Sequence, residues 1–165
     1  MTARDISLKI IEACKDSVEL NDFILTKYAK SLTYSRGLNL DIDYFSEDGY
    51  KDVPIIIIDP EKHSEQTDYG KVFSIVLHTR IYHKDEFKSG FAKVDGVITL
   101  DGIDEIEEIN RLVIIAIKDK FQSLLDIEDI ESYLDALHHV SNYTEYNGHI
   151  VMTFTQESTI GGCST

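Results

Sequence analysis

The chain contains six histidines, a residue type that can bind a metal or transfer a proton. His138 and His139 are adjacent, so their side chains point apart on either a helix or a strand. His78 lies five residues before His83, and no Cys and His residues have zinc-finger or zincin spacing. These spacings favour solvated or hydrogen-bonded histidines, and the sequence predicts neither a metal site nor a cofactor.

Carboxylates form many close pairs, for example in the stretch from Asp126 to Glu131. An EF-hand calcium loop needs oxygen ligands at its first, third and fifth positions before a glycine. Counting back from Gly49 puts Tyr44 at the first position, which excludes that motif. Nothing in the sequence around these acids selects one pair for glycosidase or nuclease chemistry. The sequence also lacks the motifs of a phosphate-binding glycine loop and of a nucleophile elbow. We therefore predict no catalytic residue and interpret the protein as a non-enzyme.

The charge of the chain limits its partners. Thirty Asp and Glu residues against 16 Lys and Arg residues give a net charge of −14, without a basic cluster. Because nucleic-acid binders neutralise phosphates with Lys and Arg, this balance disfavours DNA and RNA binding. It also disfavours anionic membrane surfaces, and no apolar run approaches the ~18 residues of a membrane span. We therefore expect neither a membrane nor specific nucleic-acid binding.

The length of 165 residues suits one domain. Residues 1–155 are expected to form it, and 156–165 a flexible polar tail. Cys14 is expected in the core and Cys163 in the tail, and two cysteines this far apart do not form a disulfide framework. Since the N-terminus also lacks an apolar stretch of signal-peptide length, we expect folding in a reducing cytoplasm.

Hydrophobic periodicity predicts the elements of this domain. A capping box formed by Thr2 and Asp5 is expected to start the first helix. Amphipathic helices are predicted over 4–17, 20–32 and 103–125, with a shorter amphipathic stretch over 127–137. The polar stretch 33–52 is expected to be a loop with a short strand at 38–44.

Two strand pairs are expected, each joined as a hairpin. Four consecutive isoleucines between Pro54 and Pro60 predict a strand buried on both faces. The next apolar run alternates with polar residues and predicts a half-exposed antiparallel partner. Asn147-Gly148 is the strongest two-residue turn signal and predicts the second hairpin. The expected pairs are 53–60 with 73–83, through a connection at 61–70, and 140–146 with 149–155.

These elements predict an α+β fold with one mostly antiparallel sheet of about four strands and helices packed on one face. Segment 84–102 interrupts the pattern and is interpreted as an excursion loop, with a hairpin signal at Asp95-Gly96. Its apolar residues form a contact surface if they project, or a satellite core if the loop folds back. The candidate interface residues are Phe87, Phe91, Val94, Val97 and Ile98.

This order of elements resembles the tail terminator and tail-completion proteins of long-tailed bacteriophages, the small subunits that close the head-proximal end of the tail tube. The resemblance covers almost the whole chain as a pattern of elements without a signature motif. Segment 84–102 and the tail beyond 156 are longer than in the simplest members. The matching elements are the N-terminal helix, the Pro-led strand from Val53 to Ile58, the strand from Phe73 to His83, the helix 103–125 and a closing hairpin from Tyr143 to Thr155.

The resemblance implies a homohexameric ring that stacks on the last ring of tail tube protein, stops its growth and offers a surface to the head connector. It implies a virion protein of the tail and neck, assembled in the cytoplasm of a bacterial host. Six acidic copies would give a negative lumen through which DNA passes without specific binding. Two other classes stay open: a small acidic binding or inhibitor module that mimics nucleic-acid charge, and an enzyme.

Overall fold

The elements of the chain were determined from a computed structural model. It describes residues 1–37, 54–67, 70–84, 91–94, 97–122, 124–140 and 143–157. The strand expected at 38–44 lies outside these residues, as do Cys163 and most of the expected tail. The elements are α1 (Ala3–Asp16), α2 (Val18–Tyr28), β1 (Thr33–Arg36), β2 (Ile55–Thr67), β3 (Gly70–Lys84), β4 (Phe91–Val94), β5 (Val97–Leu100), α4 (Asp101–Phe121), β6 (Asp126–Val140) and β7 (Tyr143–Glu157).

Five strands form one mixed sheet in the order β1-β2-β3-β7-β6, and β4 pairs with β5 in a separate two-stranded sheet. β1 runs parallel to β2, whereas the other neighbours in the large sheet are antiparallel. The α+β class is therefore confirmed, but the expected sheet of about four mostly antiparallel strands is wrong. Two strands of this sheet were not expected: β1, whose polar sequence from Thr33 to Arg36 has no apolar alternation to mark it, and β6, most of which was predicted as an amphipathic stretch.

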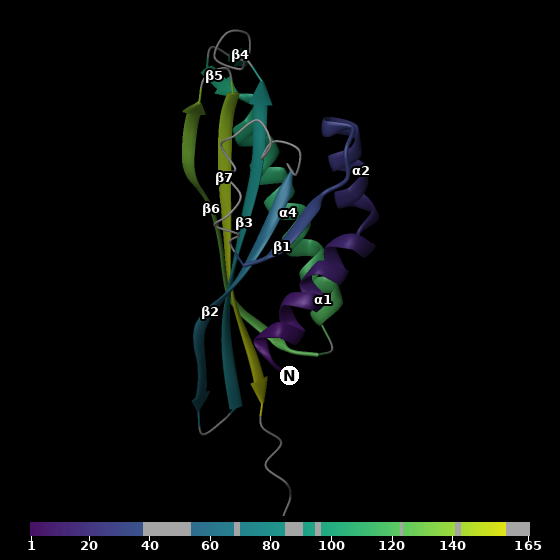
Figure 1. Cartoon of the computed structure of the whole chain (residues 1–165), viewed down its shortest axis with the longest axis vertical. Helices are drawn as coiled ribbons and strands as arrows, with labels where there is room; N and C mark the ends of the chain where they lie inside the picture. The colour runs from purple at the N-terminus through teal and green to yellow at the C-terminus, as the bar shows by residue number, and fades with distance from the viewer. Residues whose placement is uncertain are drawn as a thin grey trace, which may run out of the picture.

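The helices cover one face of the sheet (Figure 1). Alternate residues of the central strands point toward them and form the main core with the apolar stripes of α1, α2 and α4. Ile55 and Ile57 lie on the other face of β2 and are buried in a small second cluster, against which the partly buried Tyr82 packs. The largest fully buried side chains of the main core include Ile6, Ile10, Leu20, Ile24, Ile56, Ile58, Ile75, Leu77, Phe121, Tyr146 and Phe154.

The predicted capping box at the start of α1 is confirmed. The Thr2 hydroxyl accepts a hydrogen bond from the Asp5 backbone N–H at 3.2 Å, and the Asp5 carboxylate accepts one from the Thr2 N–H at 2.8 Å. These reciprocal bonds satisfy two of the donors that a helix start leaves without partners. Hydrogen bonds from Thr2 also hold the pKa of Asp5 below its ordinary value.

Two segments are strands in the structure although the sequence predicted other roles for them. Segment 61–70 was expected to be a connection, and segment 127–137 an amphipathic stretch. Residues 61–67 extend β2, and the register with β3 shifts between Pro60 and Ser64, so the proline sits at an irregularity. Residues 127–137 lie in β6, whose register with β7 also shifts at two places. Each register shift interrupts the alternation of side chains between the two faces of a strand. The spacing of the apolar residues there then resembles that of a helix.

The hairpin expected at Asn147-Gly148 is wrong, because both residues lie inside β7. That strand pairs with β3 on one side and β6 on the other. Gly148 lies under α4, where an added Cβ would be 2.8 Å from the Asn110 side-chain nitrogen and 3.0 Å from Cγ1 of Ile106. The glycine thus permits close approach of helix and sheet rather than a turn. The antiparallel pair that replaces the expected hairpin is β6 with β7, and its pairing begins where Val140 is opposite Tyr143.

Candidate interaction surface

The predicted interface residues fall mainly on one small hairpin. Phe91 and Val94 lie in β4, and Val97 and Ile98 lie in β5. Phe91 is opposite Leu100 and Val94 is opposite Val97, so the hairpin expected around Asp95-Gly96 is confirmed by its strand pairing. Phe87 lies outside the described residues. Figure 1 shows β4 and β5 at one end of the large sheet, and a contact surface there stays a prediction.

A second surface, which the sequence did not indicate, lies where α1 meets α2. A pocket of about 410 Å³ opens between this junction and α4. We call it the elbow pocket. Its lining residues are Ala13, Asp16, Ser17, Val18, Glu19, Ile115, Ala116, Asp119 and Lys120.

The elbow forms because one residue ends α1 and begins α2. The backbone N–H of Ser17 donates to the Ala13 carbonyl at 3.1 Å, which closes the last turn of α1. The Ser17 hydroxyl accepts a hydrogen bond from the Leu20 N–H at 3.4 Å, which caps α2. The extended backbone of Ser17, with φ −73° and ψ 108°, therefore turns the chain within a single residue.

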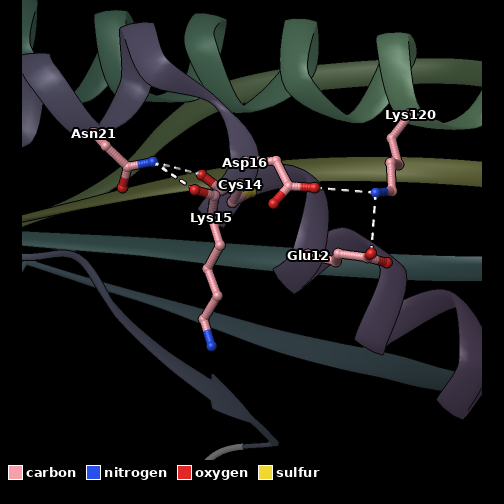
Figure 2. A network of polar contacts seen from close by, with 6 residues as sticks. All are labelled: Glu12, Cys14, Lys15, Asp16, Asn21 and Lys120. Carbon is pink, nitrogen blue, oxygen red and sulfur yellow. Dashed lines mark hydrogen bonds and ion pairs between the residues drawn. The ribbon is translucent and has the colours of Figure 1, made fainter.

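Asn21 holds the two helices at a fixed angle. Its side-chain nitrogen donates to the carbonyls of Cys14 at 3.1 Å and Lys15 at 3.0 Å (Figure 2). It also donates to the Ser17 carbonyl at 2.6 Å. The end of α1 leaves the carbonyls of Cys14 and Lys15 without an internal partner, whereas the Ser17 carbonyl also accepts a hydrogen bond from the Asn21 backbone N–H at 3.2 Å. One amide on α2 thus closes the end of α1 and gives the elbow pocket a rigid wall.

Lys120 attaches the elbow to α4. Its ammonium lies 3.1 Å from the Asp16 carboxylate and 3.2 Å from the Glu12 carboxylate (Figure 2). These partners, Asp16 first, raise the pKa of Lys120 because they favour its charged form. The side chains of Asp16 and Glu12 are 65% and 56% exposed, so water and salt screen this attachment.

Cys14 lies beneath the elbow and is fully buried, which confirms the prediction that it is a core residue. Burial raises the pKa of its thiol to about 12. A thiolate is the reactive form of cysteine, and at neutral pH this side chain is a thiol. Cys14 therefore packs in the core rather than supplying a nucleophile.

The mouth of the elbow pocket combines apolar and acidic side chains. Val18 is 71% exposed and Ile115, on the opposite wall, is 37% exposed. Ala13 and Ala116 are buried, and their small side chains leave space between the two walls. The exposed acids of the lining are Asp16, Glu19 and Asp119. This arrangement suits an aliphatic chain that carries a positive charge.

The start of α4 is attached differently, through a buried acid. Glu105 is 8% exposed, and its carboxylate accepts hydrogen bonds from the Tyr28 hydroxyl at 2.6 Å and the Lys27 ammonium at 3.2 Å. Both partners come from α2. α4 is thus attached to α2 near its start and to α1 near its end.

The histidines that the sequence singled out occupy the strands. His149 of β7 lies between His78 and Tyr133, with ring centroids 4.5 Å and 5.3 Å away on the neighbouring strands. His138 and His139 are consecutive residues of β6. In the part of the chain that the structure describes, no three His, Cys, Asp or Glu residues are grouped to hold a metal ion. His78 and His149 are cross-strand neighbours of β3 and β7.

No protein family model matches the chain, and no curated protein sequence matches it either. Within the described residues, no helix is both long and apolar enough to cross a membrane.

Proposed function

We propose that the protein is a structural subunit of a phage neck, which caps the head-proximal end of the tail tube, stops tube polymerisation and joins the tail to the head connector. The observation that carries this proposal is the open edge of the large sheet. β6, a strand of 15 residues, has a strand neighbour on one side only among the described strands. Such an edge is a template for a strand from another chain.

The order of the elements supports the same proposal. Two N-terminal helices precede the isoleucine-rich β2 and its antiparallel partner β3, and the long helix α4 precedes the pair β6 and β7. The closing hairpin of the resemblance, Tyr143 to Thr155, is replaced by the single strand β7, which pairs antiparallel with β6. Figure 1 also shows the ends of β2 and β3 projecting beyond α1, which gives the subunit a second exposed end.

The edge of β6 has features that favour specific over indiscriminate pairing. Its register with β7 shifts between Glu128 and Glu131 and again between Leu134 and Ala136. Asp129, between the first two, has a left-handed backbone with φ +46°. Exposed acids and irregular backbone restrict pairing to a partner that matches them. In the proposed homohexamer, this partner is a neighbouring copy.

The proposed partners are therefore other copies, the tail tube protein and the head connector. The proposed location is the virion, after assembly in the cytoplasm of a bacterial host. DNA passes through the lumen of the ring without specific binding, because the net charge of −14 on each copy repels phosphates. The proposed role requires no catalytic residue and no cofactor.

The test is the molar mass in solution, by light scattering, of the protein alone and with candidate tube protein. We expect a species near six times 18.8 kDa, alone or on the tube. Glu131→Lys on β6 should prevent it, whereas Glu107→Lys, the same charge change at an exposed site of α4, should not. A monomer that ignores tube protein, or equal behaviour of the two variants, would contradict the proposal.

The elbow pocket favours one alternative, a small acidic binding module. Three exposed carboxylates around an apolar opening suit a basic partner better than a strand edge does. Such a module stays monomeric or dimeric in solution. The same light-scattering experiment therefore separates the two functions, and a pulldown with basic partners would follow a monomeric result.

A further inference from the structure

We propose that the elbow pocket is a docking site for a partner protein that inserts a lysine or arginine side chain flanked by apolar residues. This proposal does not depend on the phage function, because the described residues around α1, α2 and α4 carry it alone. It commits to a protein segment as the occupant. Small cations and acidic peptides are outcomes that the test must exclude.

The apolar part of the elbow pocket fits the stem of a long basic side chain. Val18 and Ile115 face the opening from opposite walls, and the small buried Ala13 and Ala116 leave room between them. The volume of about 410 Å³ lies within the range of sites for small ligands and side chains. Lysine and arginine bury their methylene groups against such surfaces while the charged end stays near water.

The acidic part of the elbow pocket selects a cation. Lys120 is the one basic lining residue, and it already lies between Asp16 and Glu12. Arg111 also acts on Glu19, but Glu108 accepts two hydrogen bonds of 2.7 Å from it. An anionic ligand would meet uncompensated carboxylates, and a neutral apolar one would desolvate them without a partner.

The elbow pocket is built before a partner arrives. Asn21 bridges three carbonyls at the helix junction, and Ser17 caps both helices there. Lys120 holds α1 to α4 across one wall. A rigid site loses little conformational entropy on binding, so even a short segment can dock there.

The probe is a capped hexapeptide of alternating leucine and lysine, titrated into the isotope-labelled full chain and followed by NMR. We expect saturable shifts centred on the amides of Val18, Ile115 and Ala116. Glu19→Gln and Asp119→Asn should each weaken binding about two- to five-fold, as exposed charge pairs do. Ile115→Ser should weaken it at least as much, because the apolar wall is lost.

Matched controls keep the proposal falsifiable. Asp104→Asn removes an exposed charge near the start of α4, and Leu8→Ser removes an exposed apolar side chain of α1, both outside the elbow pocket. Neither should change the affinity. Equal weakening by the controls, shifts spread over the acidic surface, equal binding of a leucine–glutamate peptide, or equal binding of spermidine would each overturn the proposal.

Discussion

Helix α4 is held by charged side chains near both ends, and the two attachments differ in their access to water. Near the start, the carboxylate of Glu105 is buried and accepts hydrogen bonds from Tyr28 and Lys27. Near the end, Lys120 meets Glu12 and Asp16, whose side chains are more than half exposed. Because water and salt weaken exposed pairs far more than buried ones, the number of ion pairs at each end is a poor guide to its stability.

Removal of the buried acid should have the largest effect. Glu105→Ala leaves Tyr28 and Lys27 without their carboxylate, and we expect a loss of about 2–3 kcal/mol in the free energy of unfolding. Chemical denaturation at neutral pH measures it. The control Glu107→Ala, exposed on the same helix, should stay within about 0.5 kcal/mol. Equal losses would show that burial does not distinguish these acids.

Removal of the Asn21 side-chain amide, near the exposed attachment, should have the next largest effect on stability. Asn21→Ala removes the donor for the carbonyls of Cys14, Lys15 and Ser17, and we expect a loss of about 1–2 kcal/mol. Its exposed neighbour supplies the control, since Asp22→Ala should change little. Denaturation curves for the pair test whether the elbow depends on this amide, and a silent Asn21→Ala would refute that role.

The Tyr28 hydroxyl contributes a single bond to the buried attachment. Tyr28→Phe should cost about 1 kcal/mol, less than Glu105→Ala, because Lys27 remains beside the acid. A double-mutant cycle with Glu105→Ala, which removes the acceptor, measures the coupling between the two side chains. Additive effects of the two substitutions would mean that the hydrogen bond contributes nothing to stability.

The exposed attachment should have the smallest effect. Lys120→Met should destabilise the protein less than Tyr28→Phe does, and added salt should shrink the difference further. The pKa of Lys120 is raised above its ordinary 10.5, so the contribution is complete below that value and is lost as the pH rises through the higher one. The denaturation midpoints of the Lys120→Met variant and of the unsubstituted protein should therefore converge at high pH. A difference that grows with pH would contradict this assignment.

The parts of the fold that could be predicted are those whose signals are local. The capping box of Thr2 and Asp5 needs only its own turn. The alternation from Phe73 to Ile81 identified β3 because every second residue faces the core. Asn147-Gly148 carried an equally strong local signal, yet packing against α4 placed it inside a strand. Local patterns fail where tertiary contacts need a small residue for space rather than for a turn.

The candidate site could not be predicted for a related reason. The elbow pocket joins residues about 100 positions apart, such as Val18 and Ile115, and no spacing in the sequence relates them. Ser17 and Asn21 are residue types that favour helix caps and turns, but the sequence does not show which helix ends they close. The interface at 84–102 could be predicted because its apolar residues lie close together along the chain, in one segment that interrupts the regular pattern. Surfaces that form across helices leave no such local signal.

The position of β7 in the sheet has a consequence for synthesis on the ribosome. β7, the last strand among the described residues, lies between β3 and β6 and supplies Tyr146, Ile150, Met152 and Phe154 to the core. A nascent chain without residues 143–157 leaves the apolar face of α4 and one edge of β3 uncovered, which is the kind of surface that chaperones bind and that aggregates. The sheet can therefore be completed only after β7, which joins β3 to β6, has left the exit tunnel.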